Sequence, residues 1–269
     1  MPRRPTGVCV FCGSNGPLTD EHALQQWARE VLQIKGPVTI VRAGQVVARQ
    51  RRLNVIAPQA LCEECNGVWL GTMEGKFKRL MGRALNGLGP IFLDVGEQEF
   101  VALWIVKSAL LLELAVRFTD PGHFCPVPMS AFHWLWLHKA PPPRATVWIG
   151  ATGPQPGEEP RAAYFSNQPV SPADGHGLVG NVITFVYGNL LVKTFVVDTP
   201  DGPIPPGIVA PDVAIFAQVW PVRRNRLGWP PHGVTYSGLD DPAFMRWPLP
   251  YRPEPLPPFK PDEPPPGFE

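Results

Sequence analysis

The chain has 269 residues, of which 44% are hydrophobic and 17% are charged, and its formal net charge is +1. This composition excludes a wholly disordered chain and is sufficient for a substantial core in one large domain or two modest ones. The 36 prolines and 26 glycines predict many loops and short elements. The amino-terminal residues contain no apolar stretch typical of a secretory signal, so we expect a cytoplasmic protein.

Positive charge is concentrated in residues 1–85, and the rest of the chain carries an excess of acidic residues. A basic amino-terminal part fits a polyanionic partner, although solvated helix faces also produce such an excess. Six basic side chains are candidates for phosphate contacts, which position a protein on nucleic acid without reading its sequence. They are Arg49, Arg51, Arg52, Lys76, Lys78 and Arg79.

Two elements are predicted in the first quarter of the chain. Apolar residues at helical spacing follow the stretch TDEH and predict a helix over residues 21–33, with Thr19 or Asp20 as its N-cap. The alternation of β-branched and polar residues over residues 38–56 then predicts a β-hairpin.

Three helices are predicted in the middle of the chain. Apolar spacing in the stretch CNGVWLGTMEGKFKRLMGRAL predicts a helix that ends near Gly87. The most apolar run, residues 100–116, is shorter than the roughly 20 residues that span a bilayer. It also carries Lys107 and Glu113, so we expect a buried helix there. The tryptophan-rich residues 129–140 predict a further helix or turn.

The carboxy-terminal half is predicted to form an antiparallel sheet. Four stretches rich in β-branched and aromatic residues are expected as strands, and the third contains a hairpin turn at Tyr187-Gly188-Asn189. They span residues 144–151, 162–167, 180–198 and 213–222. From Leu249 onward prolines dominate, which predicts an unpacked or polyproline-type tail.

Four of the five cysteines form two Cys-x-x-Cys pairs, Cys9 with Cys12 and Cys62 with Cys65. In a reducing compartment such paired spacing favours a tetrahedral zinc site over disulfides, with unrelated free cysteines as the alternative. Zinc would bring the loop before Glu21 and His22 close to the helix that begins near Asn66. Cys125 is left over, and we expect a buried or half-buried thiol.

The motif residues resemble the zinc-containing HNH, or His-Me finger, endonucleases, and most closely a bacterial and phage subgroup. That subgroup reads roughly C-x-x-C-G, L-T-x-E-H and W-L, followed by C-x-x-C-N-N-G-W-M-x-x-L-E. Besides the cysteine pairs, the matching positions are Leu18-Thr19-Asp20-Glu21-His22, Trp27, Cys65-Asn66, Trp69-Leu70 and Met73-Glu74. The specific motifs cover the first third of the chain, and the remainder is similar only loosely.

The resemblance implies a metal-dependent endonuclease that hydrolyses phosphodiester bonds of DNA, with RNA not excluded, in phage biology or bacterial defence. His22 would be the general base that takes a proton from the attacking water. Glu21 and Asn66 would hold one divalent ion, Mg²⁺ or Mn²⁺, while zinc stays structural. Asn54 is the nearest candidate for the family's middle asparagine, although a strand-edge residue fits the same position.

Several alternatives remain open at this point. The position of Asn66 is often histidine in HNH enzymes, and Gly67 replaces the second asparagine of the subgroup. Glu74 is either an acid close to the site or a solvated helix residue, and His22 is either the base or a structural histidine. A catalytically inactive zinc module that binds nucleic acid or protein is therefore the alternative function.

We thus expect an α+β protein with three parts. Residues 1–88 would form a zinc-stapled HNH-like module of the ββα-metal type. Residues 89–248 would form an α+β region that contains the antiparallel sheet, and residues 249–269 would be the proline-rich tail.

Overall fold

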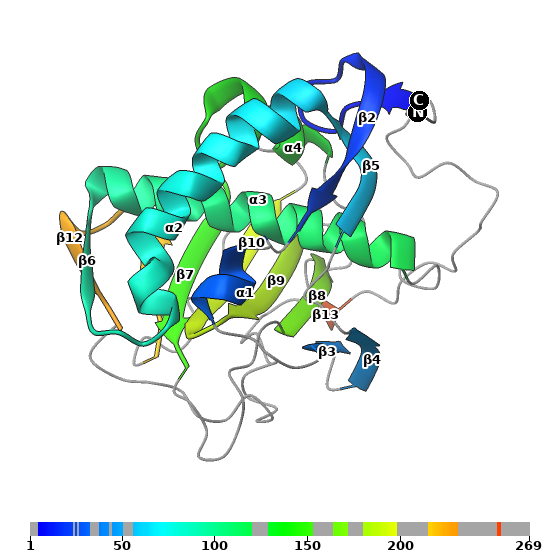
Figure 1. The fold of residues 1–269 in the computed structure, drawn as a ribbon. Helices are drawn as coiled ribbons and strands as arrows, with labels where there is room; N and C mark the ends of the chain where they lie inside the picture. The colour runs from blue at the N-terminus through cyan, green and yellow to red at the C-terminus, as the bar shows by residue number, and fades with distance from the viewer. Residues whose placement is uncertain are drawn as a thin grey trace.

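The computed structural model of the protein has a mixed α+β architecture (Figure 1). The structure describes residues 5–23, 25, 27–32, 38–42, 45–50, 56–119, 129–152, 164–171, 180–197, 215–230 and 252–253. Four residues singled out above, Arg51, Arg52, Asn54 and Cys125, lie outside these ranges.

Strand β2 (Asn15–His22) is the middle strand of a small antiparallel sheet, between β1 (Thr6–Val8) and β5 (Ile56–Cys62). The prediction of a helix from residue 21 is therefore wrong at its start, because helix α1 begins only at Trp27 and ends at Val31.

The side chains expected to cap that helix join two strands instead. The hydroxyl of Thr19 donates to the carbonyl of Leu61 at 2.9 Å, and the carboxylate of Asp20 accepts from the backbone N–H of Gln59 at 3.0 Å. Short polar side chains compete in this way for backbone groups outside helices. They fix β2 against β5.

The helix predicted after the second cysteine pair is confirmed, and its first part is wound more widely than an α-helix. Residues Glu64–Leu70 form the π-helical segment η1, which continues as α2 (Gly71–Leu85). The helix ends at Leu85, and Gly87, which follows the C-cap Asn86, has a φ of 68° in the left-handed region that favours glycine.

Helix α3 (Val95–Thr119) confirms the predicted buried helix. All residues from 101 to 115 are buried, and none of the described helices is long and apolar enough to cross a membrane. Helix α3 packs on β7, β9, β10 and β11 of the large sheet, and it also contacts α2, α4 and β5 (Figure 1). It therefore lies between the sheet and the elements that carry the cysteines.

The large sheet has the order β11-β7-β10-β9-β8-β3-β4, and β13 pairs with β8. The predicted hairpin at Gly188 is confirmed, since β9 and β10 pair antiparallel from Leu190 opposite Tyr187 onward. The strands are β3 (Val38–Arg42), β4 (Gln45–Gln50), β7 (Thr146–Ala151), β8 (Tyr164–Ser171), β9 (Gly180–Tyr187), β10 (Leu190–Val197), β11 (Ala217–Trp220) and β13 (Arg252–Pro253).

The hairpin predicted over residues 38–56 is confirmed as β3 and β4, but it joins the large sheet through a parallel pairing of Val41 with Tyr164 of β8. Strand β8 also accepts Arg252 and Pro253 as a short neighbour. The expectation of an unpacked tail is thus corrected at these two residues. The rest of the tail lies outside the described residues.

Two smaller elements complete the structure. Helix α4 (Met129–His138) forms from the tryptophan-rich stretch, and β6 (Ile91–Asp94) pairs antiparallel with β12 (Arg226–Trp229). Buried apolar residues from both sides of residue 88 belong to one hydrophobic cluster. The division of the chain at residue 88 stays a prediction.

Candidate metal centre and adjoining buried network

The four paired cysteines meet at one point, and their sulfurs all lie within 4.8 Å of one another. The backbone N–H of Gly13 donates to the carbonyl of Cys9 at 2.9 Å, which closes the first pair into a tight turn. The N–H of Val10 donates to the carbonyl of Ala60 at 3.0 Å, so this turn is attached to the strand that carries the second pair.

The sulfur cluster fits tetrahedral zinc. Zinc–sulfur bonds of about 2.3 Å place neighbouring sulfurs roughly 3.8 Å apart, and the sulfurs of Cys12 and Cys62 are 3.6 Å apart. A hydrogen bond from the Cys65 thiol lowers the pKa of Cys9 to about 4, and the same bond raises the pKa of Cys65. A lowered thiol pKa favours the thiolate, which is the form that binds metal. The cluster is therefore consistent with a structural zinc site.

Aromatic side chains of η1 and α4 pack against the first cysteine pair. Phe11, within the first cysteine pair, makes edge contacts with Trp69 and Phe132 at centroid distances of 5.0 and 5.2 Å. The ammonium of Lys139 lies 3.2 Å from the ring centroid of Trp136 and 4.1 Å from that of Trp69. Desolvation lowers the pKa of Lys139, and the negative charges of Cys65 and Cys12 oppose this effect.

The end of β2 carries the candidate base. His22 is half-buried and lies opposite Ile56 of β5. The side-chain amide of Asn66 donates to the hydroxyl of Thr19 and to the backbone carbonyl of Asp20, both at 2.9 Å. The start of η1 is therefore fixed to the strand that ends in His22, and the Oδ1 atom of Asn66 is its remaining acceptor.

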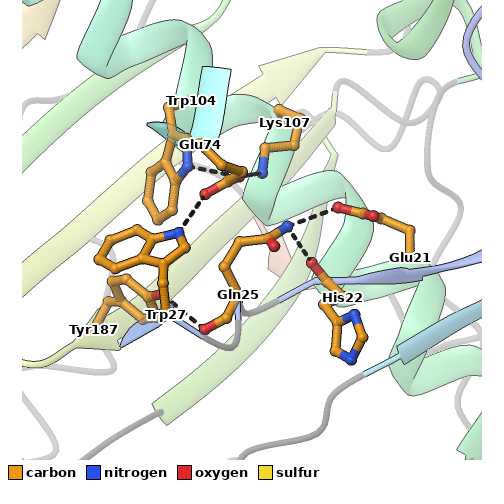
Figure 2. A network of polar contacts seen from close by, with 8 residues as sticks. All are labelled: Glu21, His22, Gln25, Trp27, Glu74, Trp104, Lys107 and Tyr187. Carbon is orange, nitrogen blue, oxygen red and sulfur yellow. Dashed lines mark hydrogen bonds and ion pairs between the residues drawn. The ribbon is translucent and has the colours of Figure 1, made fainter. Parts of the chain in front are cut away.

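Glu74 is the centre of a buried polar network (Figure 2). One carboxylate oxygen accepts from the indole N–H of Trp104 at 2.9 Å and from the ammonium of Lys107, and the other accepts from the indole of Trp27 at 3.1 Å. Glu74 is 6% exposed and Lys107 is fully buried. The alternative that Glu74 is a solvated helix residue is therefore wrong.

Glu21 points into the same interior (Figure 2) and is 4% exposed. Its carboxylate accepts from the side-chain amide of Gln25 at 2.7 Å. Desolvation raises the pKa of Glu21, and the positive charge of Lys107 opposes this rise. The carboxylate of Glu21 faces the network, and the amide of Asn66 bonds to Thr19 and Asp20. The expectation that Glu21 and Asn66 hold one ion together therefore stays a prediction.

The basic candidates on α2 lie at the surface. Lys76, Lys78 and Arg79 are all exposed. The ammonium of Lys76 lies 4.1 Å from the ring centroid of Phe100, and that of Lys78 lies 3.6 Å from a carboxylate oxygen of Glu30. Arg49 lies on β4, where only the backbone is described.

Four residues of the network were not predicted as site residues from the sequence: Gln25, Trp104, Lys107 and Tyr187. A charged residue within the otherwise apolar run of α3 was the available signal for Lys107, because a buried ammonium requires a partner. The tie between Gln25 and Tyr187, whose hydroxyl donates to the Gln25 carbonyl at 3.5 Å, has no comparable signal.

Comparisons of the chain with protein-family models, curated proteins and solved structures found no match. The resemblance to HNH endonucleases therefore rests on the motif residues of the sequence alone.

Proposed function

We propose that this protein is a metal-dependent HNH-type endonuclease that hydrolyses phosphodiester bonds of DNA. The observation that carries the proposal is the arrangement of β2, β5 and the helix that follows. Two antiparallel strands lead into a helix, the cysteine cluster lies at the turn between β5 and the helix, and the histidine of the motif ends the first strand. This order supports the ββα-metal type of module that the resemblance implies.

In the proposed reaction, His22 acts as the general base. Its neutral imidazole takes a proton from a water molecule while the water oxygen forms a bond to phosphorus. The phosphorus–oxygen ester bond breaks, and the leaving oxygen takes a proton from solvent. His22 is half-buried at the end of β2.

A bound Mg²⁺ or Mn²⁺ would neutralise the negative charge that develops on the phosphate oxygens. Asn66, through its Oδ1 atom, and Glu21 are the candidate residues to hold this ion. Mg²⁺ commonly takes most of its ligands from water and substrate phosphates, so a protein site with few ligands fits this ion. Lys76, Lys78 and Arg79 would contact the phosphate backbone.

A non-catalytic zinc module that binds nucleic acid or protein is the second candidate function. Within the described ranges, the four cysteines are the only group of three or more His, Cys, Asp or Glu side chains that converge as metal ligands. The amide of Asn66 is also already bonded to β2. Both observations fit a module that has zinc but no catalytic ion.

Cleavage by wild-type protein and by His22→Ala separates the two functions. Supercoiled plasmid and a labelled RNA would be incubated with Mg²⁺, Mn²⁺ or EDTA. The loss of a general base should lower the cleavage rate by about 10²–10⁴-fold, while zinc content and DNA binding stay unchanged. His138→Ala, at an exposed histidine of α4, is the control and should cut as wild type does. Equal cleavage by His22→Ala would refute the proposal.

A further inference from the structure

We infer that Gln25 is a positioning residue that holds the backbone of His22 in place and that Glu21 acts through it. The inference rests on the proposed function. The side-chain amide of Gln25 donates to the Glu21 carboxylate at 2.7 Å and to the main-chain carbonyl of His22 at 2.8 Å. One amide nitrogen therefore joins a buried carboxylate to the residue that carries the base (Figure 2).

The network approaches His22 from the buried side only. In Figure 2 the imidazole of His22 points away from Gln25, Glu21 and Lys107, while the carbonyl of His22 faces them. The hydrogen bond from Gln25 therefore constrains the main chain at the end of β2 rather than the imidazole. A group that fixes the main chain behind a base is suited to orient it toward a substrate.

The Glu21 carboxylate also lies near a positive charge. Burial raises the pKa of Glu21, and the positive charge of Lys107, which bonds to Glu74, opposes this rise. An ionised carboxylate is a stronger acceptor for the Gln25 amide than a protonated one. The helix that follows the cysteine module thereby contributes to the position of His22.

Stability alone is a weak explanation for this arrangement. Buried ion pairs are often replaced by apolar residues without loss of stability, because desolvation offsets their attraction. Here two carboxylates, Glu21 and Glu74, are buried beside the single ammonium of Lys107. An arrangement of this kind is better explained by the geometry that it imposes at His22.

The first test is Gln25→Ala, assayed for cleavage of plasmid DNA. A displacement of about 1 Å in a catalytic group can lower a rate by roughly 10²-fold, so kcat should fall about 10- to 100-fold with KM for DNA unchanged. The matched control is Gln98→Ala, because Gln98 is a buried glutamine whose amide also bridges two carbonyls, those of Leu93 and Arg224, far along the chain from His22. Gln98→Ala should keep kcat.

Two further variants test whether the effect passes through His22. If Gln25 acts only by orienting the base, Gln25→Ala should have no further effect on kcat in a His22→Ala background. Glu21→Gln keeps an oxygen that accepts from Gln25 and Glu21→Ala does not, so kcat of Glu21→Gln should be higher than that of Glu21→Ala. Additive losses, or a kcat of Glu21→Gln no higher than that of Glu21→Ala, would overturn the inference.

A spectroscopic measurement separates failure of this inference from failure of the proposed function. In protein labelled with ¹⁵N-histidine, Gln25→Ala should shift or broaden the signals of His22, assigned by their loss in His22→Ala, and leave those of His133 and His138 in place. This outcome does not require cleavage. If the wild type cuts no nucleic acid, the endonuclease proposal fails. Unchanged His22 signals in Gln25→Ala would overturn the positioning role, whatever the activity.

Discussion

Strand β2 connects two regions that are built in different ways. At its beginning lies the metal centre, whose four ligands come from two short sequence motifs. At its end lies the buried network, whose members come from β2, Gln25 after it, α1, α2, α3 and β9. The first region is readable from residue spacing because each pair positions its own sulfurs. The second region exists only when distant helices and strands have packed together.

The largest effect is expected from the metal centre. Cys62→Ser removes one of four thiolates, and since structural zinc contributes folding free energy of about 10–16 kcal/mol in small zinc domains, the variant should lose zinc and unfold around its cysteines. Elemental analysis and a thermal melt would measure both losses. Cys125→Ser, at the cysteine outside the two Cys-x-x-Cys motifs, is the control that should retain zinc. A Cys62→Ser protein with full zinc and an unchanged melt would disprove the four-thiolate site.

Substitutions in the buried network should lower the stability of the protein without loss of zinc. Lys107→Met leaves Glu74 and Glu21 buried without their cation, which should lower the free energy of unfolding by about 3–5 kcal/mol. Urea denaturation would measure this change, and zinc content should stay at that of the wild type. The double variant with Glu74→Gln should lose less than the sum of the single variants, because the two groups contact each other. Strictly additive losses would show that the pair is not coupled.

A smaller effect is expected from Lys139, whose positive charge lies near the metal centre. Zinc with four thiolates carries a net negative charge, and the ammonium of Lys139 lies near Cys12 and Cys65. Lys139→Met should weaken zinc binding by roughly 10-fold, in the range typical for residues that contact metal ligands. Competition with a chromogenic chelator would report the affinity. Lys139→Arg keeps the charge and should bind zinc as the wild type does, whereas equal affinity for Lys139→Met would argue against an electrostatic role.

The smallest effect concerns the surface of α2. If Lys76 and Arg79 each contact one phosphate, the double alanine variant should reduce the slope of log affinity for duplex DNA against log salt by about 0.9 for each contact. Fluorescence anisotropy over a salt series would measure the slope. Lys78→Ala should change it less, because Lys78 is paired with Glu30. Identical slopes for all the variants would show that α2 makes no phosphate contacts.

The sequence predicted the elements whose pattern is local. The hairpin at Gly188, the buried helix α3 and the cysteine cluster all follow from spacing over short stretches. The helix expected at Glu21 was wrong for a physical reason, because the side chains of Thr19 and Asp20 bond to β5, which lies far along the chain. Local patterns do not contain such partners.

The candidate site could be predicted only in part. The spacing of Cys9, Cys12, Cys62 and Cys65 predicted the metal centre, and the same motifs pointed to His22 as the base. The surroundings of Glu74 could not be predicted, since its partner Lys107 is 33 residues away and on another helix. The burial of Glu21 depends on the same packing, so its orientation could not be deduced from the motif.

The turn at Gly188 implies a strict constraint on how this sequence can evolve. Its φ is 59°, and a Cβ atom there would lie 2.7 Å from the carbonyl oxygen of Leu85 and 2.4 Å from a methyl carbon of Leu32. The next residue, Asn189, donates its backbone N–H to that same carbonyl at 3.0 Å. Because backbone atoms contact backbone atoms here, substitutions of neighbouring side chains cannot make room for a Cβ atom at residue 188. In homologues that keep both the sheet and α2, glycine should be as invariant at this position as the zinc cysteines.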